Sequence, residues 1–293
     1  MPNIGDKVHV VVPSLSATTE QLTLLRSIAE SAGATFVVVA NSRDLAQRLD
    51  GTDTRYVTSR RNEGFAASID LGARVESWDW LVVLNDDIQP DTARLTATLK
   101  SAFADFSDQY ALVHLDGEKA RAIPGIFATL ANVSMTSAVL RRLLRSQRPA
   151  DGPTYRSFSA VGIARGAWDA LGGLDTRYPF TFEDADFARR AAPAGFAATA
   201  LSEPAARHLH SVTTSRWIAE VLPVSSYSAL EYLDAWYGRR SAMRIVLVLA
   251  LVIRAPIALL RKRRRLHMRG IVRAIKAIAT DTRPSLPEWA GTE

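Results

Sequence analysis

The sequence predicts an α/β protein, with a mainly parallel sheet flanked by helices and a basic, apolar helical segment at the C-terminus. Two observations predict this fold class. Short apolar runs rich in valine alternate with helical patterns over the first hundred residues, which is typical of parallel strands joined by right-handed crossovers. Polar residues directly follow several of these runs, at the strand ends where parallel sheets bind ligands.

The first half of the chain gives the clearest elements. Residues 8–12 (VHVVV) predict a buried strand, and residues 20–32 predict a helix because Leu22, Leu25 and Ile28 recur on one face. The other elements expected here are strands at 36–40, 56–58 and 80–84 and helices at 44–49 and 64–75.

The second half is less regular. A helix is expected from Asp91 to about residue 106, and long helices from Leu222 onward. The remaining elements expected are strands at 111–115 and 158–163 and helices near 135–145, at 166–171 and at 183–191.

Composition limits the chemistry. With 293 residues, 47% of them hydrophobic, the chain can bury one large core or two modest ones. It has no cysteine, which excludes disulfides and thiolate chemistry, so a metal site would need Asp, Glu or His. The first residues lack a basic run followed by a long apolar stretch, and we expect no secretory signal.

The positive charge is concentrated near the C-terminus. Residues 239–276 hold twelve Lys or Arg and no acid, and they flank an apolar run at 245–260. No aromatic residues that could stack on bases interleave with these charges, so an anionic membrane surface is favoured over nucleic acid. Arg254 and Pro256 interrupt the run, which favours an interfacial amphipathic anchor over a span. A core helix or a dimer helix is the alternative.

Asn85, Asp86 and Asp87 directly follow the apolar strand at 80–84. A carboxylate at a strand end can hold Mn²⁺ or Mg²⁺ against a diphosphate, because these ions prefer oxygen ligands. The alternative is a turn that caps the next helix.

Two later segments carry further candidates. Glu183, Asp184 and Asp186 lie at a predicted helix N-terminus, where a carboxylate could accept a proton from a hydroxyl or could simply stabilise the helix. His208 and His210 alternate along a possible strand, so at most one is expected to complete a metal site. The other histidines, His9, His114 and His267, are expected to be structural.

The order of these motifs is more specific than any one of them. The segments concerned are VVVPS at 10–14, VVVANS at 37–42, RNEGFAASIDLG at 61–72, LVVLNDDI at 81–88, VGIARGAWDALGGLDTRY at 161–178, FEDADFARR at 182–190 and HLHSVT at 208–213. Through them, residues 7–215 resemble family 2 glycosyltransferases, particularly the rhamnosyltransferase-like and galactofuranosyltransferase-like members. The resemblance implies the GT-A fold, with a Rossmann-like sheet.

The resemblance also implies roles for residues. Asp87 matches the metal-binding carboxylate of the family's DxD motif, Asn85 replaces its first acid, Asp184 matches the catalytic base and His208 matches the late metal ligand. His208 is chosen over His210 because HLHSVT aligns with H-x-G-S-x-T. The donor-binding residues implied are Pro13, Ser14, Asn41, Asn62, Gly64, Phe65, Asn85 and Asp86. The acceptor-side residues implied are Gly172, Gly173, Asp175, Glu183 and Arg189.

The function implied is inverting, metal-dependent transfer of rhamnose or another hexose, from dTDP-rhamnose or a UDP-sugar to a hydroxyl of a glycan or polyprenyl-linked acceptor. The setting expected is cell-envelope polysaccharide synthesis, by a peripheral protein at the cytoplasmic face of the plasma membrane. Residues 1–220 would form the catalytic domain and 221–293 the membrane-associating region. The oligomeric state cannot be predicted from the sequence.

Two other functions remain open. A sugar nucleotidyltransferase has a similar α/β layout, but it usually has a glycine-rich loop after the first strand, and residues 11–20 contain no glycine. A non-catalytic, membrane-associated module that binds nucleotide sugars or acts as a scaffold would also suit the basic tail.

Overall fold

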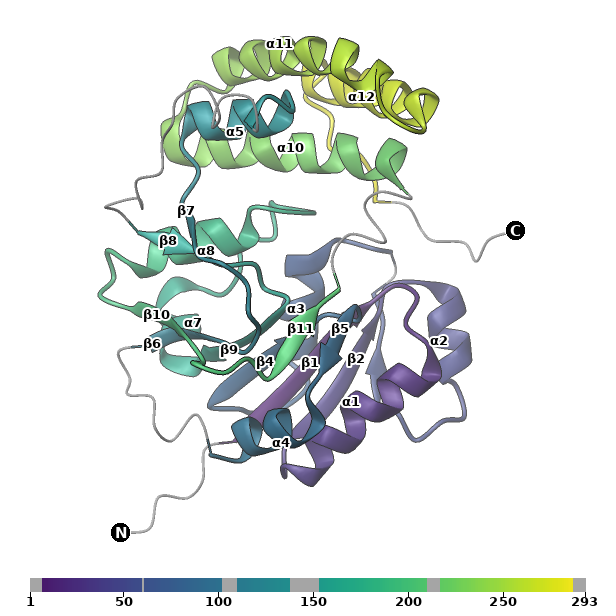
Figure 1. Cartoon of the computed structure of the whole chain (residues 1–293), viewed down its shortest axis with the longest axis vertical. Helices are drawn as coiled ribbons and strands as arrows, with labels where there is room; N and C mark the ends of the chain where they lie inside the picture. The colour runs from purple at the N-terminus through teal and green to yellow at the C-terminus, as the bar shows by residue number, and fades with distance from the viewer. Residues whose placement is uncertain (1–6, 60, 102–109, 138–152, 210–216, 287–293) are drawn as a thin grey trace.

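The computed structural model describes residues 7–59, 61–101, 110–137, 153–209 and 217–286 (Figure 1). A seven-stranded sheet has the order β10-β6-β9-β4-β1-β2-β3. Its strands are β1 (Val8–Ser14), β2 (Thr35–Ala40), β3 (Tyr56–Val57), β4 (Trp80–Leu84), β6 (Tyr110–His114), β9 (Ala160–Ala164) and β10 (Ala197–Ala200). The helices that flank this sheet are α1 (Thr19–Ser31), α2 (Arg43–Leu49), α3 (Phe65–Ala73), α4 (Thr92–Ser101), α7 (Arg165–Leu171) and α8 (Glu183–Ala191).

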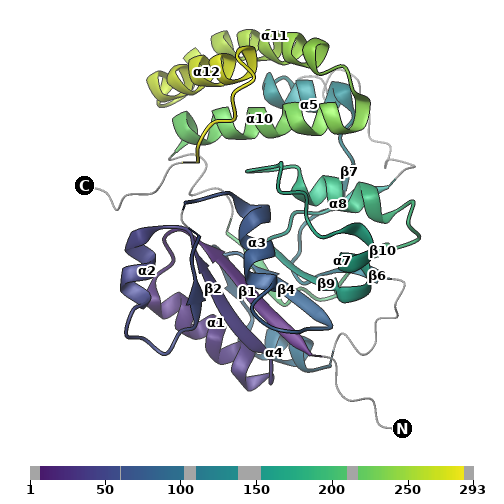
Figure 2. The same ribbon diagram turned by 180° about the vertical axis from the view of Figure 1, so that it is seen from behind.

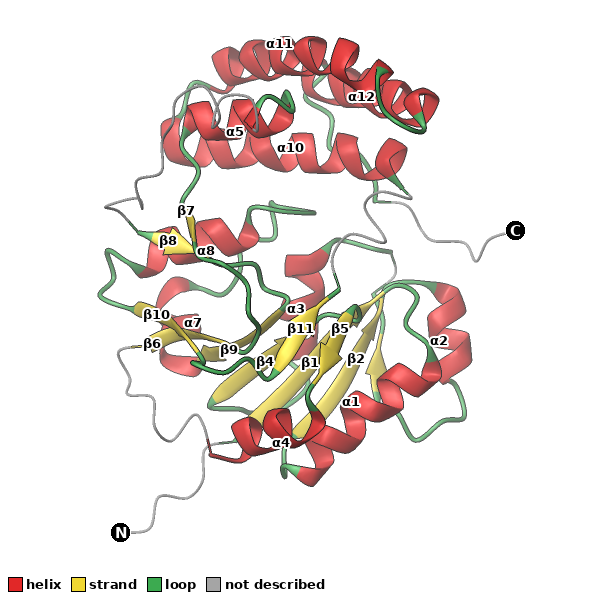
Figure 3. Ribbon diagram, in the orientation of Figure 1, coloured by secondary structure: helices red, strands yellow, loops and turns green. Residues whose placement is uncertain are grey.

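Alternate residues of the central strands point to opposite faces of the sheet, as the pleat requires. Val10 and Val12 pack with α1, α2 and α4, whereas Val11 and Val37 pack with α3, α7 and α8. Figures 2 and 3 show these helices on the two sides of the sheet. The predicted α/β class, with a mostly parallel sheet between helices, is confirmed.

One strand runs against the others. β9 lies antiparallel between β4 and β6 and pairs with both, so the sheet is mixed rather than wholly parallel. The strand predicted at 158–163 therefore exists, but begins at Ala160.

Short pairings complete the fold. β5 (Ile88–Pro90) pairs antiparallel with β11 (Ala206–His208), and β7 (Arg121–Ala122) pairs antiparallel with β8 (Thr154–Tyr155). Of these four strands, the sequence analysis offered only β11, as a possible strand around His208, and it did not predict β5, β7 or β8. Most of the helix expected near 135–145 lies outside the described residues, and α5 (Ile126–Val133) was not predicted.

A layer of helices lies beyond the sheet, at the top of Figure 1. It consists of α10 (Ile218–Tyr237), α11 (Arg240–Leu259) and α12 (Arg264–Ala279), with α5 beside them. The apolar core that these helices share also includes Tyr178 and Ala185, which lie before and within α8. Among the described residues, α11 is the one helix long and apolar enough to cross a membrane, and 33% of its most apolar window is buried.

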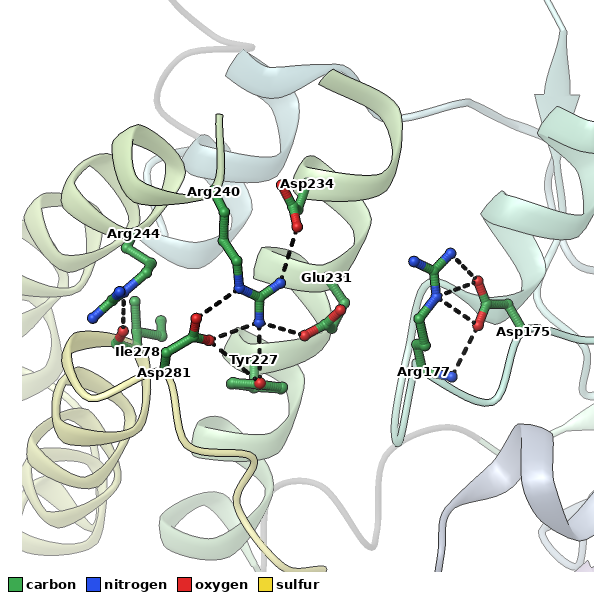
Figure 4. A network of polar contacts seen from close by, with 9 residues as sticks. All are labelled: Asp175, Arg177, Tyr227, Glu231, Asp234, Arg240, Arg244, Ile278 and Asp281. Atoms are coloured by element: carbon green, nitrogen blue, oxygen red, sulfur yellow. Dashed lines mark hydrogen bonds and ion pairs between the residues drawn. The ribbon is translucent and has the colours of Figure 1, made fainter. Parts of the chain in front are cut away.

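Arg240 fastens this layer together (Figure 4). Its guanidinium lies 2.7 Å from Glu231, 3.1 Å from Asp234 and 2.7 Å from Asp281, so α10, the start of α11 and the residues after α12 meet at one cation. Arg244 adds a hydrogen bond from Nε to the carbonyl oxygen of Ile278, at 2.8 Å.

Candidate functional site

The carboxyl ends of β1 and β4 are joined by a direct hydrogen bond. Ser14 Oγ donates to Asp86 Oδ2 at 2.6 Å and accepts from the Ala17 N–H at 3.0 Å. Burial raises the pKa of Asp86, and the hydrogen bond from Ser14 partly offsets that rise. Pro13 is buried opposite Val39 of β2. The structure thus brings together three of the predicted donor-binding residues, Pro13, Ser14 and Asp86.

The end of β2 meets the turn before α3 through Ser68. Its hydroxyl lies 2.9 Å from Asn41 Oδ1 and 2.7 Å from the Gly64 carbonyl oxygen. In the same turn, the Gly64 N–H donates to Asn62 Oδ1 at 3.1 Å, and the Phe65 N–H donates to the Pro179 carbonyl at 3.3 Å. The predicted donor-side residues of this turn therefore lie beside Asn41.

Only glycine fits at position 64. Its φ is +107°, in the region that residues with a Cβ avoid, and an added Cβ would lie 2.1 Å from the Pro179 carbonyl oxygen. The backbone of the turn is consequently held tightly against the 179–182 segment.

Asp87 and His208 lie in contact. His208 Nε2 is 3.1 Å from Asp87 Oδ1 and 3.2 Å from Asp87 Oδ2. The β5–β11 ladder produces this contact by pairing His208 with Ile88, and the Leu209 N–H donates to the Asp87 carbonyl at 3.0 Å. The structure therefore brings the two predicted metal ligands together, while His210 lies outside the described residues.

Glu118 is a site residue that the sequence analysis missed. Its Oε1 lies 3.4 Å from His208 Nδ1, and its side chain is 7% exposed. The Glu118 N–H donates to Asp116 Oδ1 at 3.2 Å, and Ser159 donates to the other oxygen of Asp116. Asp116 and Glu118 follow β6 as Asn85 and Asp87 follow β4, so the strand-end rule could have found them.

The two carboxylates act on the imidazole from opposite sides. The hydrogen bond with Asp87 raises the pKa of His208, burial opposes it, and Glu118 adds to the rise. Each ring nitrogen of His208 thus faces a carboxylate, which fixes the orientation of the ring.

A divalent cation fits this arrangement. Asp87 and His208 Nε2 offer oxygen and nitrogen ligands on one side, whereas Glu118 faces the other ring nitrogen and supports the ring. No group of three Asp, Glu or His in the described part of the chain could by itself hold a metal ion. Mg²⁺ and Mn²⁺ sites often use one or two protein carboxylates together with substrate phosphates and water. Asn85 Oδ1, buried and without a hydrogen-bond partner among the described residues, is a further polar atom at the end of β4.

The predicted base lies in an acidic pair at the start of α8, in which Glu183 is buried and Asp184 is half-buried. Burial raises the pKa of Asp184, and burial together with the charge of Asp184 raises the pKa of Glu183. Glu183 Oε2 is buried without a hydrogen-bond partner among the described residues.

Arg121 links the acidic pair to the histidine site. Its guanidinium lies 3.2 Å from Glu118 Oε2, and its positive charge lowers the pKa of Asp184. In the β7–β8 ladder Arg121 stands opposite Tyr155, whose pKa burial and the charge of Asp184 raise to about 12. The contacts therefore run from Asp87 through His208 and Glu118 to Arg121, whose positive charge acts on Asp184.

The predicted acceptor-side residues divide between two places. Gly172 and Gly173 both have positive φ and form the loop after α7, where Arg190 donates to the Gly173 carbonyl at 3.0 Å. Asp175 follows in that loop, in an ion pair with Arg177 at 2.6 Å (Figure 4). Arg189 points instead to α10, 4.2 Å from the centre of the Trp236 ring.

An open pocket of about 540 Å³ adjoins the histidine. The residues that line it are Gly117, Glu118, Arg207, His208 and Leu209. The site thus offers space beside the candidate metal ligands for a molecule larger than the ion.

Comparison with known proteins identifies a solved structure with a similar fold. No protein-family model matches the chain, and no curated protein matches it in sequence. Among solved structures, it is similar to a mannosyltransferase from Pyrobaculum calidifontis, in complex with GDP-Man and Mn²⁺. The match covers 96% of this chain and 89% of that one, with a TM-score of 0.50 and 12% identity. The likeness shows that the chain has the fold of a solved glycosyltransferase over nearly its whole length.

Proposed function

We propose that this chain is an inverting glycosyltransferase that uses a nucleotide-diphosphate sugar and Mn²⁺ or Mg²⁺. The observation that carries the proposal is the contact of Asp87 with His208, which Glu118 joins to Arg121, whose charge acts on the half-buried acid Asp184. A metal-binding pair and a carboxylate of raised pKa are the groups that such a transfer requires.

The donor is proposed to bind along the carboxyl ends of β1, β2 and β4. Ser14, Asn41 and the 62–65 turn line that edge, and ligands of open α/β sheets bind there. The closely packed Gly64 keeps the turn in place, so the donor would meet a preformed surface.

Asp87 and His208 would hold the divalent cation. When bound, the cation supplies positive charge that stabilises the leaving diphosphate. Glu118 holds the His208 ring so that Nε2 stays directed at Asp87.

Asp184 is proposed as the base. A carboxylate whose pKa is raised by burial takes up a proton more readily once ionised, so it suits removal of the acceptor hydroxyl's proton. Attack by that hydroxyl on the anomeric carbon, opposite the diphosphate, is a single displacement and inverts the configuration.

The finer assignments belong to the same proposal. The similar mannosyltransferase was solved with GDP-Man, whereas the sequence motifs resemble enzymes that use dTDP-rhamnose or UDP-linked sugars. We propose a hexose donor, a glycan or polyprenyl-linked acceptor and a role in cell-envelope polysaccharide synthesis at the cytoplasmic face of the membrane. Residues 1–220 would provide the chemistry, with 221–293 as the membrane-associating part.

A thermal-shift screen tests the core of the proposal. dTDP-rhamnose, UDP-hexoses and GDP-mannose would each be added with Mn²⁺, with Mg²⁺ or with a chelator. One donor is expected to raise the melting temperature only when a cation is present, because ligands that bind the folded state stabilise it. A full screen without any cation-dependent shift would overturn the proposal.

A further inference from the structure

The outer face of α11 is an apolar stripe. Its exposed side chains, with exposed fractions in parentheses, are Ile245 (63%), Leu249 (55%), Val252 (53%), Ile253 (53%) and Leu260 (89%). Their spacing of three, four and seven residues puts them on one side of the helix. On the opposite side of the helix, Leu247 and Leu251 are fully buried. An exposed apolar face of this length is typical of a surface that binds a protein partner or a membrane.

A basic run directly follows the stripe. Residues 261–265 (RKRRR) are all exposed and extend from the turn after α11 into the first residues of α12. In the part of the chain that the structure describes, no acidic side chain forms an ion pair with Arg261, Lys262, Arg264 or Arg265. Arg240, by contrast, is neutralised by three carboxylates. The stripe therefore ends beside four exposed cations, Arg261, Lys262, Arg264 and Arg265, that no ion pair with a described acid neutralises.

The other side of α11 packs against the rest of the protein. α12, α10 and α5 pack against it, and the buried Arg254 donates to the Val133 carbonyl at 2.9 Å. A membrane-spanning helix would need to leave these partners and carry Arg254 into the hydrocarbon. Figures 1 and 2 both show α11 lying across the end of the molecule, with α10 between it and α8.

We propose that the protein docks on an anionic lipid bilayer through the outer face of α11, with the helix lying flat in the interface. The apolar stripe enters the boundary between headgroups and acyl chains, and residues 261–265 bind anionic headgroups. Charge complementarity favours this occupant over a second copy of the chain, because residues 239–276 contain no acid with which a second copy meeting at this face could pair the basic run.

The orientation of the docked protein also bears on the candidate base, an inference that rests on the proposed function. α8 carries Asp184, and its Arg189 donates to Tyr232 of α10 at 3.1 Å. A bilayer at α11 therefore lies on the same side of the sheet as α8, which suits an acceptor attached to a lipid.

Vesicle flotation with the full chain tests the docking without any donor or acceptor, so its failure and a failure of the glycosyltransferase proposal are distinguishable. Vesicles containing phosphatidylglycerol should bind the protein at low salt and release much of it at high salt, and pure phosphatidylcholine should bind it far less. Equal binding to both lipids, or no binding to either, overturns the proposal.

Paired substitutions test each part of the surface. Replacing both Arg264 and Arg265 by Gln should weaken binding about fivefold for each charge. The matched change Arg43→Gln, at an exposed position on α2, should leave it unchanged. Leu249→Ser with Ile253→Ser should reduce binding about tenfold, whereas Leu24→Ser, also exposed, should not. Equal losses in test and control variants contradict the assignment.

The depth of the helix can be measured directly because the chain has no cysteine. Single cysteines at Ile245, Leu249, Ile253 and Leu260, labelled with an environment-sensitive fluorophore, should be quenched equally by shallow nitroxide lipids. A depth that increases along the helix would show a span, and a dimer that vesicles do not dissociate would show a protein interface. Either result overturns flat docking.

Discussion

His208 Nε2 lies 3.1 Å from Asp87 Oδ1, although 121 residues separate them in the sequence. Two three-residue strands, β5 and β11, create the contact, and Glu118 holds the ring from its other side. This relationship allows the role of each residue to be tested separately.

Replacing Glu118 by Gln should weaken Mn²⁺ binding about tenfold, because loss of a carboxylate behind a ligating histidine usually has this effect. His208→Asn should weaken it more. Electron paramagnetic resonance of free Mn²⁺, titrated in the presence of a nucleoside diphosphate, measures both. Glu30→Gln, at an exposed position on α1, is the control. If Glu118→Gln binds Mn²⁺ like the unchanged protein, Glu118 does not position His208.

Asp184→Asn should lower the transfer rate by about a factor of 10² to 10⁴, the usual contribution of a general base. Donor affinity should stay nearly the same, because the amide keeps the shape of the carboxylate. Turnover and donor-induced thermal shift are measured on one preparation. Asp70→Asn, which removes only an exposed ion pair with Arg74, serves as the control. A folded Asp184→Asn protein that no longer binds donor would contradict its assignment as the base.

Glu183→Gln should stabilise the protein at neutral pH. Burial raises the pKa of Glu183 in the folded state, so the folded state binds a proton more tightly than the unfolded chain does. This carboxyl therefore makes the protein less stable as pH rises from its ordinary pKa of 4.5 to its raised value. Melting temperatures across pH should show the variant more stable above that range and equal to the unchanged protein below pH 4.5. An advantage that persists at acid pH would rule out this explanation.

Gly64→Ala should destabilise the protein by about 3 kcal/mol, because the new Cβ meets the Pro179 carbonyl and positive φ is strained. Donor binding should also weaken, since the 62–65 turn must move. Gly166→Ala in α7 is a suitable comparison, because its Cβ would meet nothing within 4 Å. Urea unfolding and thermal shift provide the two measurements. Equal stabilities for the two variants would show that the contact with Pro179 is unimportant.

Arg240→Gln should reduce the free energy of unfolding by about 2 kcal/mol, because three partly buried carboxylates lose their shared cation. Arg74→Gln breaks an exposed pair with Asp70 and should change stability by less than about 0.5 kcal/mol. Urea unfolding of both variants makes the comparison. Similar small losses in the two would mean that Arg240 does not fasten the outer helices.

The first half of the fold could be predicted because its signals are local. The valine runs and helical spacings up to residue 84 each define one element, and β1, α1, β2, α2, α3 and β4 lie within a few residues of the predicted positions. The rule that ligands bind at strand ends also led to Pro13, Asn41 and Asp87, which lie at the same edge of the sheet.

The remaining features depend on pairings between distant segments. β5 and β11 are too short to show a pattern, and β9 is antiparallel because of its neighbours rather than its own sequence. The strand-end rule could have pointed to Glu118, but its position beside His208 follows from the path of the chain after β6, which no local pattern shows. The direction of Arg189 is likewise decided by the aromatic residues of α10.

Arg189 lies among Tyr232, Trp236 and Tyr237, and the same apolar core contains Ala185 of α8 and Leu230 of α10. A chain shortened to end near residue 217 would leave these surfaces of α8 open to water, next to the acid that we assign as base. The outer helices therefore support the surroundings of the candidate base, and their removal to improve solubility would expose that acid to water.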